Sequence, residues 1–326
     1  MKRSLSGIKS TGTPHVGNYL GMIRPAIDLQ IDHEAFYFIA DYHALTTEKD
    51  GGEIFDSTLS VAAYFLAFGL DPNKAALFRQ SAVPEVTELA WLLSSVYNIG
   101  SLERAHTYKA AKDLGKANAL NHATFMYPVL MAADILIYNS DVVPVGADQL
   151  QHLEMTRDMA SRFNAIYGDL LKLPEAIVKE NVAVVPGRDG RKMSKSYKNT
   201  IEPLTSSKKL KKQIMSIVTD VKSLEEPKDP ESCNVFALYK LFSSAEECRQ
   251  MEANYRGGNY GYGHAKIALF EKMDAYFSPY REKYSALIDD PAEIEEALAM
   301  GAQRVRPIVL ETMKKLRLAV GIGRRA

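Results

Sequence analysis

Short apolar runs alternate with amphipathic stretches over the first 200 residues. Residues 4–9, 35–41, 141–146 and 182–185 are predicted strands. Between them, residues 54–70, 86–96 and 127–138 place apolar side chains at spacings of three and four, which predicts helices with one buried face. In the first of these helices, that face would hold Phe55, Leu59, Ala62, Ala63 and Leu66. The alternation predicts an α/β, Rossmann-like fold with a parallel sheet.

The strand pattern fades after about residue 202. Residues 208–217, 235–242, 265–276 and 291–320 are instead predicted helices. The segment GRDGRKMSKSY, residues 187–197, has almost no apolar side chains and is typical of an exposed, mobile loop. We therefore predict an α/β domain with an inserted helical segment over residues 1–200 and an all-helical domain over residues 201–326.

Composition excludes several classes of protein. The 326 residues are 46% hydrophobic and 25% charged, which is too apolar for a disordered chain. Two cysteines, Cys233 and Cys248, are too few for a disulfide framework, a cysteine-rich zinc site or an iron-sulfur cluster. The sequence shows neither a signal peptide nor an apolar run of about 18 residues, so we expect a cytoplasmic protein that does not cross a membrane.

The first candidate for chemistry is STGTPHVGNYLG, residues 10–21, which follows a predicted strand and leads into a helix. Backbone N–H groups at such a turn favour an anion such as phosphate. Gly17 would let a nucleotide approach the backbone, while His15 and Asn18 supply side-chain donors. A simple helix-capping turn explains this segment equally well.

The second candidate is the loop segment RKMSKS, which contains Arg191, Lys192 and Lys195. Cations on a loop suit a polyphosphate whose charge grows as a leaving group departs. The alternative is an ordinary solvated basic loop.

Together, HVGN and KMSKS resemble the two signatures of the class I aminoacyl-tRNA synthetases. Further stretches narrow the resemblance to the bacterial tryptophanyl-tRNA synthetases: IADYHALTT, ELAWLLSSVYNIGSLER, YPVLMAADILIYNSDVVPVGADQLQHLEMTRDMASRFN and the C-terminal GAQRVRPIVLETMKKLRLAVG. The resemblance covers nearly the whole chain. It implies ATP-dependent activation of tryptophan and transfer of the tryptophanyl group to tRNA(Trp).

The segment YPVLMAAD is informative by itself. Asp134 lies three residues after Met131 in an apolar helical stretch, so the two share a face. A buried carboxylate requires a donor, and an indole N–H can only donate. The alternative is an aspartate that caps or pairs locally. The resemblance favours a tryptophan pocket, and it implies that the pocket is formed or bordered by Tyr127, Met131, Asp134, Val143, His43 and Gln149.

The resemblance also implies the ATP site. Lys192, Lys195, His15 and Asn18 would act on the phosphates as the catalytic residues. Around them we expect contacts to ATP from Lys9, Ser10, Thr11, Gly17, Gly146, Asp148, Gln149, Met193, Ser194 and Ser196. Asp148 is also a candidate N-cap of the next helix. Mg²⁺ would accompany ATP, and we expect no other metal.

Several positions depart from the family pattern. Lys9 stands where many bacterial relatives have Gln, and Ala147 replaces a commonly acidic residue. Either Lys109 or Lys112 is expected to touch ATP. Two cysteines cannot reproduce the four-cysteine iron-sulfur site of some relatives, so we predict no cluster.

The resemblance further implies a homodimer and a tRNA anticodon-binding role for residues 201–326 with their C-terminal helix. The segment ELAWLLSSVYNIG is the candidate dimer interface within the catalytic domain, although Trp91 fits an internal core equally well. Because the chain has 40 basic and 40 acidic residues, RNA binding would rest on local clusters. One comprises Lys208, Lys209, Lys211 and Lys212. The other, opposed only by Glu311, comprises Arg304, Arg306, Lys314, Lys315, Arg317, Arg324 and Arg325. Solvated helix faces explain both clusters about as well.

Three other functions compete with this one. A tyrosyl-tRNA synthetase would share the fold and the first step, but the YPVLMAAD and VPVGADQ segments argue against it. A cofactor adenylyltransferase would share the H-x-G-N turn without needing KMSKS. A non-catalytic regulator that binds RNA or tryptophan would have no use for intact His15, Asn18, Lys192 and Lys195.

Overall fold

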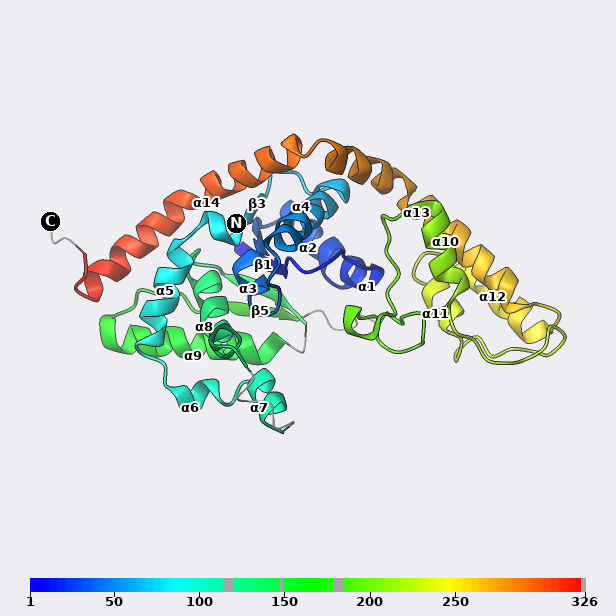
Figure 1. Ribbon diagram of the computed structural model, residues 1–326, viewed down its shortest axis with the longest axis horizontal. Coiled ribbons are helices and arrows are strands. Elements are labelled where there is room, and N and C mark those ends of the chain that lie inside the picture. Colours follow the sequence, from blue (N-terminus) through cyan, green and yellow to red (C-terminus); the bar gives the residue numbers. More distant parts are fainter. Residues whose placement is uncertain (114–119, 147–148, 179–184, 324–326) are drawn as a thin grey trace. The chain divides into compact units, whose positions relative to one another are not determined.

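The computed structural model describes residues 1–113, 120–146, 149–178 and 185–323 (Figure 1). The chain divides into two compact units. Unit 1 comprises Met1–Gly12, Ala26–Glu180 and Pro291–Ala326, and unit 2 comprises Thr13–Pro25 and Asn181–Asp290. The assignment of catalysis to residues 1–200 and of anticodon binding to residues 201–326 stays a prediction.

Unit 1 is built on a five-stranded parallel sheet. The strands are β1 (Arg3–Lys9), β2 (Glu34–Ala40), β3 (Ala76–Arg79), β4 (Val142–Val145) and β5 (Glu175–Val178), in the spatial order β3-β2-β1-β4-β5. Six of the seven residues of β2 are buried, as expected for a central strand covered on both faces. The predicted Rossmann-like α/β architecture is confirmed.

The helices of unit 1 cover the sheet and extend beyond its edge. They are α3 (Asp41–Ala44), α4 (Gly51–Ala67), α5 (Glu85–Ser94), α6 (Ile99–Leu102), α7 (His106–Asp113), α8 (His122–Leu136), α9 (Leu150–Tyr167) and α14 (Ala292–Ala319). The side-chain carbonyl of Asn121 caps the first turn of α8 by accepting from the Thr124 backbone N–H at 2.8 Å. Helices α5, α8 and α9 lie side by side in Figure 1 and pack against one another.

The C-terminal helix α14 lies directly against the edge strand β3 (Figure 1). A glycine allows this close approach, because a Cβ atom at Gly301 would stand 2.0 Å from the carbonyl oxygen of Leu77. Charged pairs strengthen the contact: the Arg79 guanidinium donates two hydrogen bonds of 2.6 Å to the Glu295 carboxylate. The tail is therefore a structural part of unit 1.

Gly301→Ala is expected to lower the free energy of unfolding by about 1–3 kcal/mol, because the added methyl group must push α14 away from β3. Gly263→Ala is the matched control, since a Cβ at Gly263 meets nothing within 4 Å in its helix. That control should be neutral or slightly stabilising. Thermal unfolding of both variants tests the prediction, and equal stability of the two would contradict the packing of α14 on β3.

The regular elements in the described part of unit 2 are helices, joined by long loops and one isolated bridge between Pro186 and Lys192. Unit 2 contains α1 (Val16–Asn18), the π-helical turn η1 (Tyr19–Ile23), the 3₁₀ turn η6 (Lys195–Tyr197), α10 (Ser207–Met215), α11 (Asn234–Tyr239), α12 (Ala245–Gly257) and α13 (Tyr262–Asp289). Helix α2 (Arg24–Asp28) spans the division between the units. The predicted helical C-terminal region is confirmed, and α12 is a helix that the apolar pattern missed.

Three predicted strands are confirmed as β1, β2 and β4, whereas the predicted strand over residues 182–185 falls largely outside the described residues. Strands β3 and β5 were not among the predicted strands. The prediction that Phe55 is buried is wrong. Its side chain is exposed near the start of α4, with the Arg79 guanidinium 5.7 Å above its ring, since the buried part of α4 begins at Ser57. Among the described helices, none has the length and hydrophobicity to cross a membrane.

Candidate active site

The predicted acid lies inside unit 1 and faces the protein interior. Asp134, on α8, is 1% exposed. Its Oδ2 is 2.9 Å from Nε2 of His43, which lies on α3 directly after strand β2. The Gln80 amide nitrogen lies 2.8 Å from both carboxylate oxygens. The chain itself therefore supplies two donors to Asp134.

Burial raises the pKa of Asp134, because it penalises the charged form. The hydrogen bonds from His43 and Gln80 oppose this effect, since both favour the carboxylate. Nearby Asp41 adds to the rise through repulsion between like charges. Asp134 is therefore a desolvated carboxyl group whose ionised form is stabilised by the hydrogen bonds from His43 and Gln80.

Gln80 is a residue that the sequence did not single out. It lies in the short turn η3 (Gln80–Ala82), which follows β3, and it is completely buried. In a parallel sheet, the carboxyl ends of neighbouring strands meet at one edge, where substrate sites gather. Recognition of β3 as a strand would have placed Gln80 beside His43 at that edge.

A second, partly buried chain of polar groups lies on α8 and at the start of α9. The Tyr127 hydroxyl is hydrogen-bonded to Nε2 of His152, and Nδ1 of His152 is 3.0 Å from Oε1 of Gln149. His152, which is 5% exposed, was also missed. If the Gln149 oxygen accepts from Nδ1–H, Nε2 accepts from the tyrosine hydroxyl. His152 thus holds Tyr127 and Gln149, two of the predicted tryptophan-pocket residues, in position.

The remaining pocket candidates have mixed positions. Met131 is half-buried on α8 and packs against the core, while Val143 is buried in strand β4 as part of that core. The hypothesis that Tyr127 begins a helix is wrong, because α8 begins at His122 and Pro128 lies inside it. The tryptophan-binding roles of these residues stay predictions.

In unit 2, the HVGN segment forms a capping box. Nδ1 of His15 accepts from the backbone N–H of Asn18 at 3.2 Å, and Oδ1 of Asn18 accepts from the backbone N–H of His15 at 3.1 Å. The helix-capping interpretation is therefore confirmed for the structure. It leaves room for the functional role, since an Nδ1 that accepts places the ring proton on Nε2.

His15 is held in its neutral form. Burial lowers its pKa to about 4, and the positive charge of Lys195 contributes to the decrease. The two signature motifs therefore interact electrostatically within unit 2. Gly17 adds a steric link, because a Cβ atom at this position would stand 3.5 Å from the Met193 Cβ and 3.0 Å from the His15 ring.

The KMSKS loop is folded around one buried asparagine. The Asn199 side chain, 3% exposed, donates to Oδ1 of Asp189 at 2.6 Å and to the Lys192 carbonyl at 3.1 Å. Its own carbonyl accepts from the Ser194 backbone N–H at 2.8 Å. Asn199 thus holds the loop in place through three hydrogen bonds. The sequence did not indicate this role, because Asn199 lies outside the KMSKS motif.

The loop presents its cations outward. Lys192 and Lys195 are exposed, while Met193 is buried and anchors the loop through its backbone N–H to the Val185 carbonyl at 2.9 Å. Ser194 is half-buried, and Ser196 is exposed. Although Lys195 as a whole is exposed, partial desolvation of its ammonium lowers its pKa. The expected phosphate contacts of these residues stay predictions.

Asn199→Ala is expected to lower the rate of the adenylate-forming step that the resemblance implies at least tenfold, because the loop loses three hydrogen bonds worth about 1 kcal/mol each. Tryptophan affinity should be unchanged. Single-turnover kinetics and equilibrium binding measure the two quantities. Asn254→Ala, on α12, is the matched control and should leave both at wild-type values. An Asn199→Ala enzyme with the wild-type rate would contradict the role of Asn199 in holding the loop in place.

At the end of β1, the Lys9 ammonium donates to the hydroxyls of Thr46 and Thr47 at 3.0 and 2.9 Å, and burial lowers its pKa. Ser10 follows, and its buried hydroxyl has no hydrogen-bond partner among the described residues. Thr11 is half-buried, with its N–H bonded to the Lys9 carbonyl. An unsatisfied buried hydroxyl is a group that a ligand can satisfy, which suits the predicted ATP contact of Ser10.

The loop after β4 is described in part. Gly146 is exposed, and its carbonyl accepts from the Gln149 backbone N–H at 2.9 Å. The other predicted ATP contact, Asp148, lies outside the described residues, as does Ala147. Their roles toward the nucleotide stay predictions.

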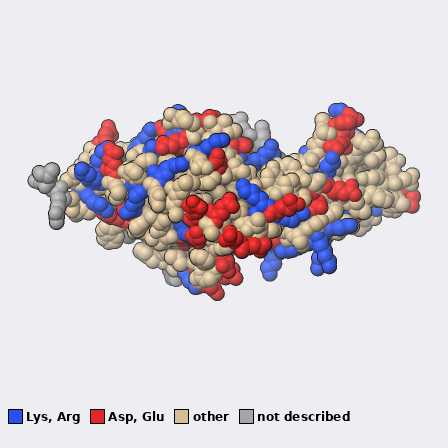
Figure 2. All heavy atoms as spheres, turned by 90° about the horizontal axis from the view of Figure 1, so that it is seen from above, with Lys and Arg blue, Asp and Glu red and all other residues tan. Residues whose placement is uncertain are grey.

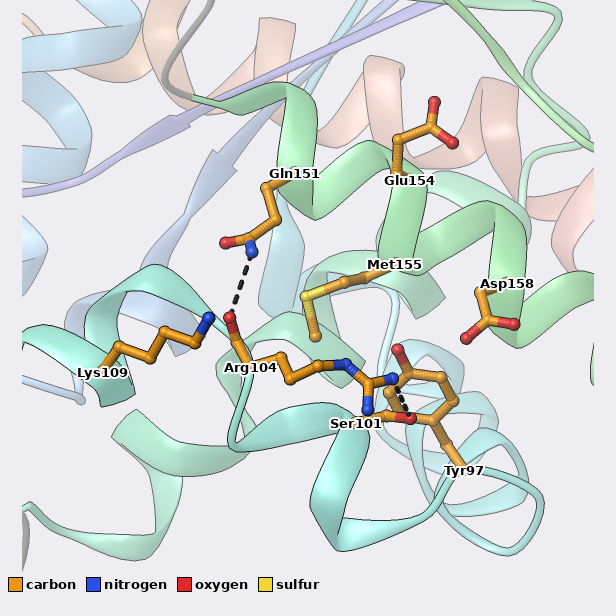
Figure 3. Close-up of a pocket in the computed structure, with 8 residues that line it drawn as sticks. All are labelled: Tyr97, Ser101, Arg104, Lys109, Gln151, Glu154, Met155 and Asp158. Atoms are coloured by element: carbon orange, nitrogen blue, oxygen red, sulfur yellow. Dashed lines mark hydrogen bonds between the residues drawn. The ribbon is translucent and has the colours of Figure 1, made fainter. Parts of the chain in front are cut away.

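A hollow of about 300 Å³ lies between α7, α9 and the segment around α6 (Figure 3). Arg104 and Lys109 line it opposite Glu154 and Asp158, and the Arg104 guanidinium donates to the Ser101 hydroxyl at 2.9 Å. Lys112 lies on the same helix as Lys109 and is exposed. The prediction that one of these two lysines contacts ATP stays a prediction.

Two arginines of the C-terminal basic cluster form ion pairs within unit 1. The prediction that only Glu311 opposes it is wrong, because Arg306 and Arg317 pair with Glu85 and Glu88 of α5 at 2.6 and 2.5–2.7 Å. These partners are distant in sequence, so a local count of charges cannot find them. Arg324 and Arg325 lie outside the described residues. Basic and acidic side chains are interspersed on the face that Figure 2 displays.

Two lysines of the α10 cluster have partners within the chain. Lys209 pairs with Glu202 at 2.8 Å, and the Lys211 ammonium lies 5.4 Å from the centre of the Phe270 ring.

Neither cysteine forms a disulfide, and the described residues contain no group of three or more His, Cys, Asp and Glu side chains suited to a metal ion. The expected absence of zinc and of an iron-sulfur cluster stays a prediction.

Comparison with known proteins places the chain in a family. Residues 2–278 match the family described as tRNA synthetases class I (W and Y). The tryptophan–tRNA ligase of Fusobacterium nucleatum subsp. nucleatum is 48% identical over 323 residues, which cover 99% of this chain and 98% of that relative.

Solved structures agree. The crystal structure of the Campylobacter jejuni tryptophanyl-tRNA synthetase complexed with ADP and tryptophan has a TM-score of 0.92 and 47% identity, over 98% of this chain and 99% of that chain. The tyrosyl-tRNA synthetase of Aeropyrum pernix, at 19% identity and a TM-score of 0.66 over 91% of this chain and 89% of that chain, shares only the fold. The chain therefore belongs to the class I tRNA synthetases, within the tryptophanyl-tRNA synthetase family.

Proposed function

We propose that the protein is a tryptophan–tRNA ligase that activates L-tryptophan with ATP and transfers it to tRNA(Trp). The observation that carries this proposal is the buried carboxylate of Asp134 among the apolar residues of α8. Such a group is costly unless donors reach it, and an indole N–H is a donor that phenylalanine lacks. Family membership supplies the reaction.

The first step joins tryptophan to AMP. The tryptophan carboxylate attacks the α-phosphorus of ATP, the bond to the β-phosphate oxygen breaks, and pyrophosphate leaves. Mg²⁺ enters with ATP as part of the substrate complex. Catalysis needs alignment and charge stabilisation without a covalent enzyme intermediate. We assign the phosphate donors to His15, Asn18, Lys192 and Lys195.

The neutral state of His15 supports its assigned role. Its Nδ1 is engaged with the Asn18 backbone, so the ring offers Nε2–H as a neutral donor to a phosphate oxygen. The positive charge of Lys195 also lowers the pKa of His15, which supports the assignment of both residues to one phosphate site. A positive charge at this point stabilises the charge that develops on leaving pyrophosphate.

The second step transfers the tryptophanyl group from the adenylate to the terminal ribose of tRNA(Trp). The ribose hydroxyl attacks the tryptophanyl carbonyl, and AMP leaves. We expect the partly unpaired lysines of α10 to contact tRNA phosphates, which position an RNA without reading its sequence. Family membership also supports the cytoplasmic location.

A homodimer is the proposed assembly. The Trp91 side chain on α5 is 77% exposed and Ile99 on α6 is 68% exposed. The alternative that Trp91 lies in the internal core of the chain is therefore wrong, and its exposure supports the proposed place in a dimer interface. Light scattering of the purified chain measures the assembly directly.

Pyrophosphate exchange into ATP tests the proposed function. Labelled pyrophosphate should enter ATP when tryptophan is present and fail to enter with tyrosine or without an amino acid. Stimulation by tyrosine alone would indicate a tyrosyl-tRNA synthetase. Absence of exchange with both amino acids would favour the non-catalytic regulator. Aminoacylation of tRNA(Trp) tests the second step.

A further inference from the structure

We propose that Gln80 is a positioning residue that orients the Asp134 carboxylate as the acceptor for the indole N–H. This inference rests on the proposed function and adds a determinant of specificity to it. Gln80 is completely buried and lies 54 residues from Asp134 in sequence. It reaches the acid from η3, at the carboxyl end of strand β3.

The orientation of the Gln80 amide is fixed by its other end. Its Oε1 accepts from the backbone N–H groups of Tyr42 and His43 at 3.1 and 3.4 Å. Backbone N–H groups can only donate, so the carbonyl end must face α3. The NH₂ end consequently faces Asp134, where the reversed amide would place an oxygen against a carboxylate.

The same amide touches both oxygens of the acid. Nε2 of Gln80 is 2.8 Å from Oδ1 and 2.8 Å from Oδ2, while His43 bonds to Oδ2 only. In the described network, Oδ1 therefore receives one hydrogen bond and Oδ2 receives two. A carboxylate offers about four acceptor positions. We assign the indole N–H to Oδ1, the oxygen with more remaining capacity.

Gln80 also affects the strength of the acceptor. Burial raises the pKa of Asp134, and the Gln80 hydrogen bond is among the interactions that oppose this rise. A carboxylate is a stronger acceptor than a protonated acid. Loss of the Gln80 donors should weaken the bond to an indole N–H more than the packing of the ring, which depends on apolar contacts.

The test compares tryptophan with β-(3-benzothienyl)alanine, in which sulfur replaces the indole N–H. We expect the wild-type protein to prefer tryptophan in kcat/KM for pyrophosphate exchange. In Gln80→Met, the side chain keeps its approximate shape but loses its donors, and the preference should fall about 10- to 100-fold. A purely structural defect would lower both activities equally and leave their ratio unchanged.

Gln80→Glu separates the two ends of the side chain. It keeps an oxygen for the Tyr42 and His43 N–H groups but removes the amide donors, so the ratio should fall as in Gln80→Met. Ser81→Ala is the matched control, because it removes a hydrogen bond to Asp41 in the same turn without touching Asp134. This control should keep the wild-type ratio. Circular dichroism establishes that each variant is folded.

The outcomes are distinct. If either folded Gln80 variant keeps the wild-type preference, the positioning role is overturned while the proposed function stands. If the wild-type protein shows no tryptophan-dependent exchange, the proposed function itself fails. If Gln80→Met does not fold, Gln80→Glu decides the question, since it retains the hydrogen bonds that hold η3 to α3.

Discussion

Asp134→Asn is expected to lower kcat/KM for tryptophan-dependent pyrophosphate exchange by about 10²- to 10³-fold. Asparagine has nearly the same size as aspartate, but its amide turns one acceptor into a donor. That donor would face either the Gln80 amide or the indole N–H. The variant loses a charge-assisted hydrogen bond and leaves a buried donor unpaired, and each of these effects is costly.

Equilibrium binding locates the defect. Tryptophan affinity should fall with the exchange activity, whereas binding of ATP alone should stay near the wild-type value. Asp71→Asn is the matched control, because that carboxylate accepts from the Asn73 backbone N–H in a turn and asparagine can do the same. Normal tryptophan binding by folded Asp134→Asn would remove Asp134 from the pocket.

Lys195→Ala is expected to lower the maximal rate of exchange by about 10²- to 10³-fold, the usual effect of removing one donor placed at a developing charge. Ground-state binding of tryptophan should change little, because the ammonium acts on the phosphates. The predicted signature is therefore a large change in kcat with a small change in the KM for tryptophan.

Lys283→Ala, an exposed lysine on α13 outside the loop, is the matched control for charge. It should exchange pyrophosphate at the wild-type rate. Lys195→Arg adds a second comparison, since it keeps the charge and changes the geometry of the donors. A Lys195→Ala enzyme with an unchanged kcat would show that the loop cation has no part in the transition state.

The two signature motifs show which structural features a local sequence pattern can predict. The spacing of His15 and Asn18 predicted either a cap or a ligand site, and the capping box is now confirmed. The sequence of the KMSKS loop marked its cations correctly as exposed. It did not reveal Asn199, because three hydrogen bonds from one buried side chain depend on how residues 185–199 close on themselves.

The charges of α14 illustrate the opposite case. From the sequence, Arg306 and Arg317 belong to a basic tail available for RNA. In the structure, both pair with acids of α5 that lie 221 and 229 residues earlier. A local count of charges treats such acids as absent, and only the packing of α14 on unit 1 brings them into reach.

The sequence by itself determined the alternation of strands and helices, the helical C-terminal region, both signature motifs and the isolated acid of α8. Each of these is encoded by residues close together in the chain, through periodicity, capping or motif spacing. The tertiary structure decided which groups meet that acid. His43 and Gln80 lie 91 and 54 residues from Asp134, and they converge on it because parallel strands end at a common edge of the sheet.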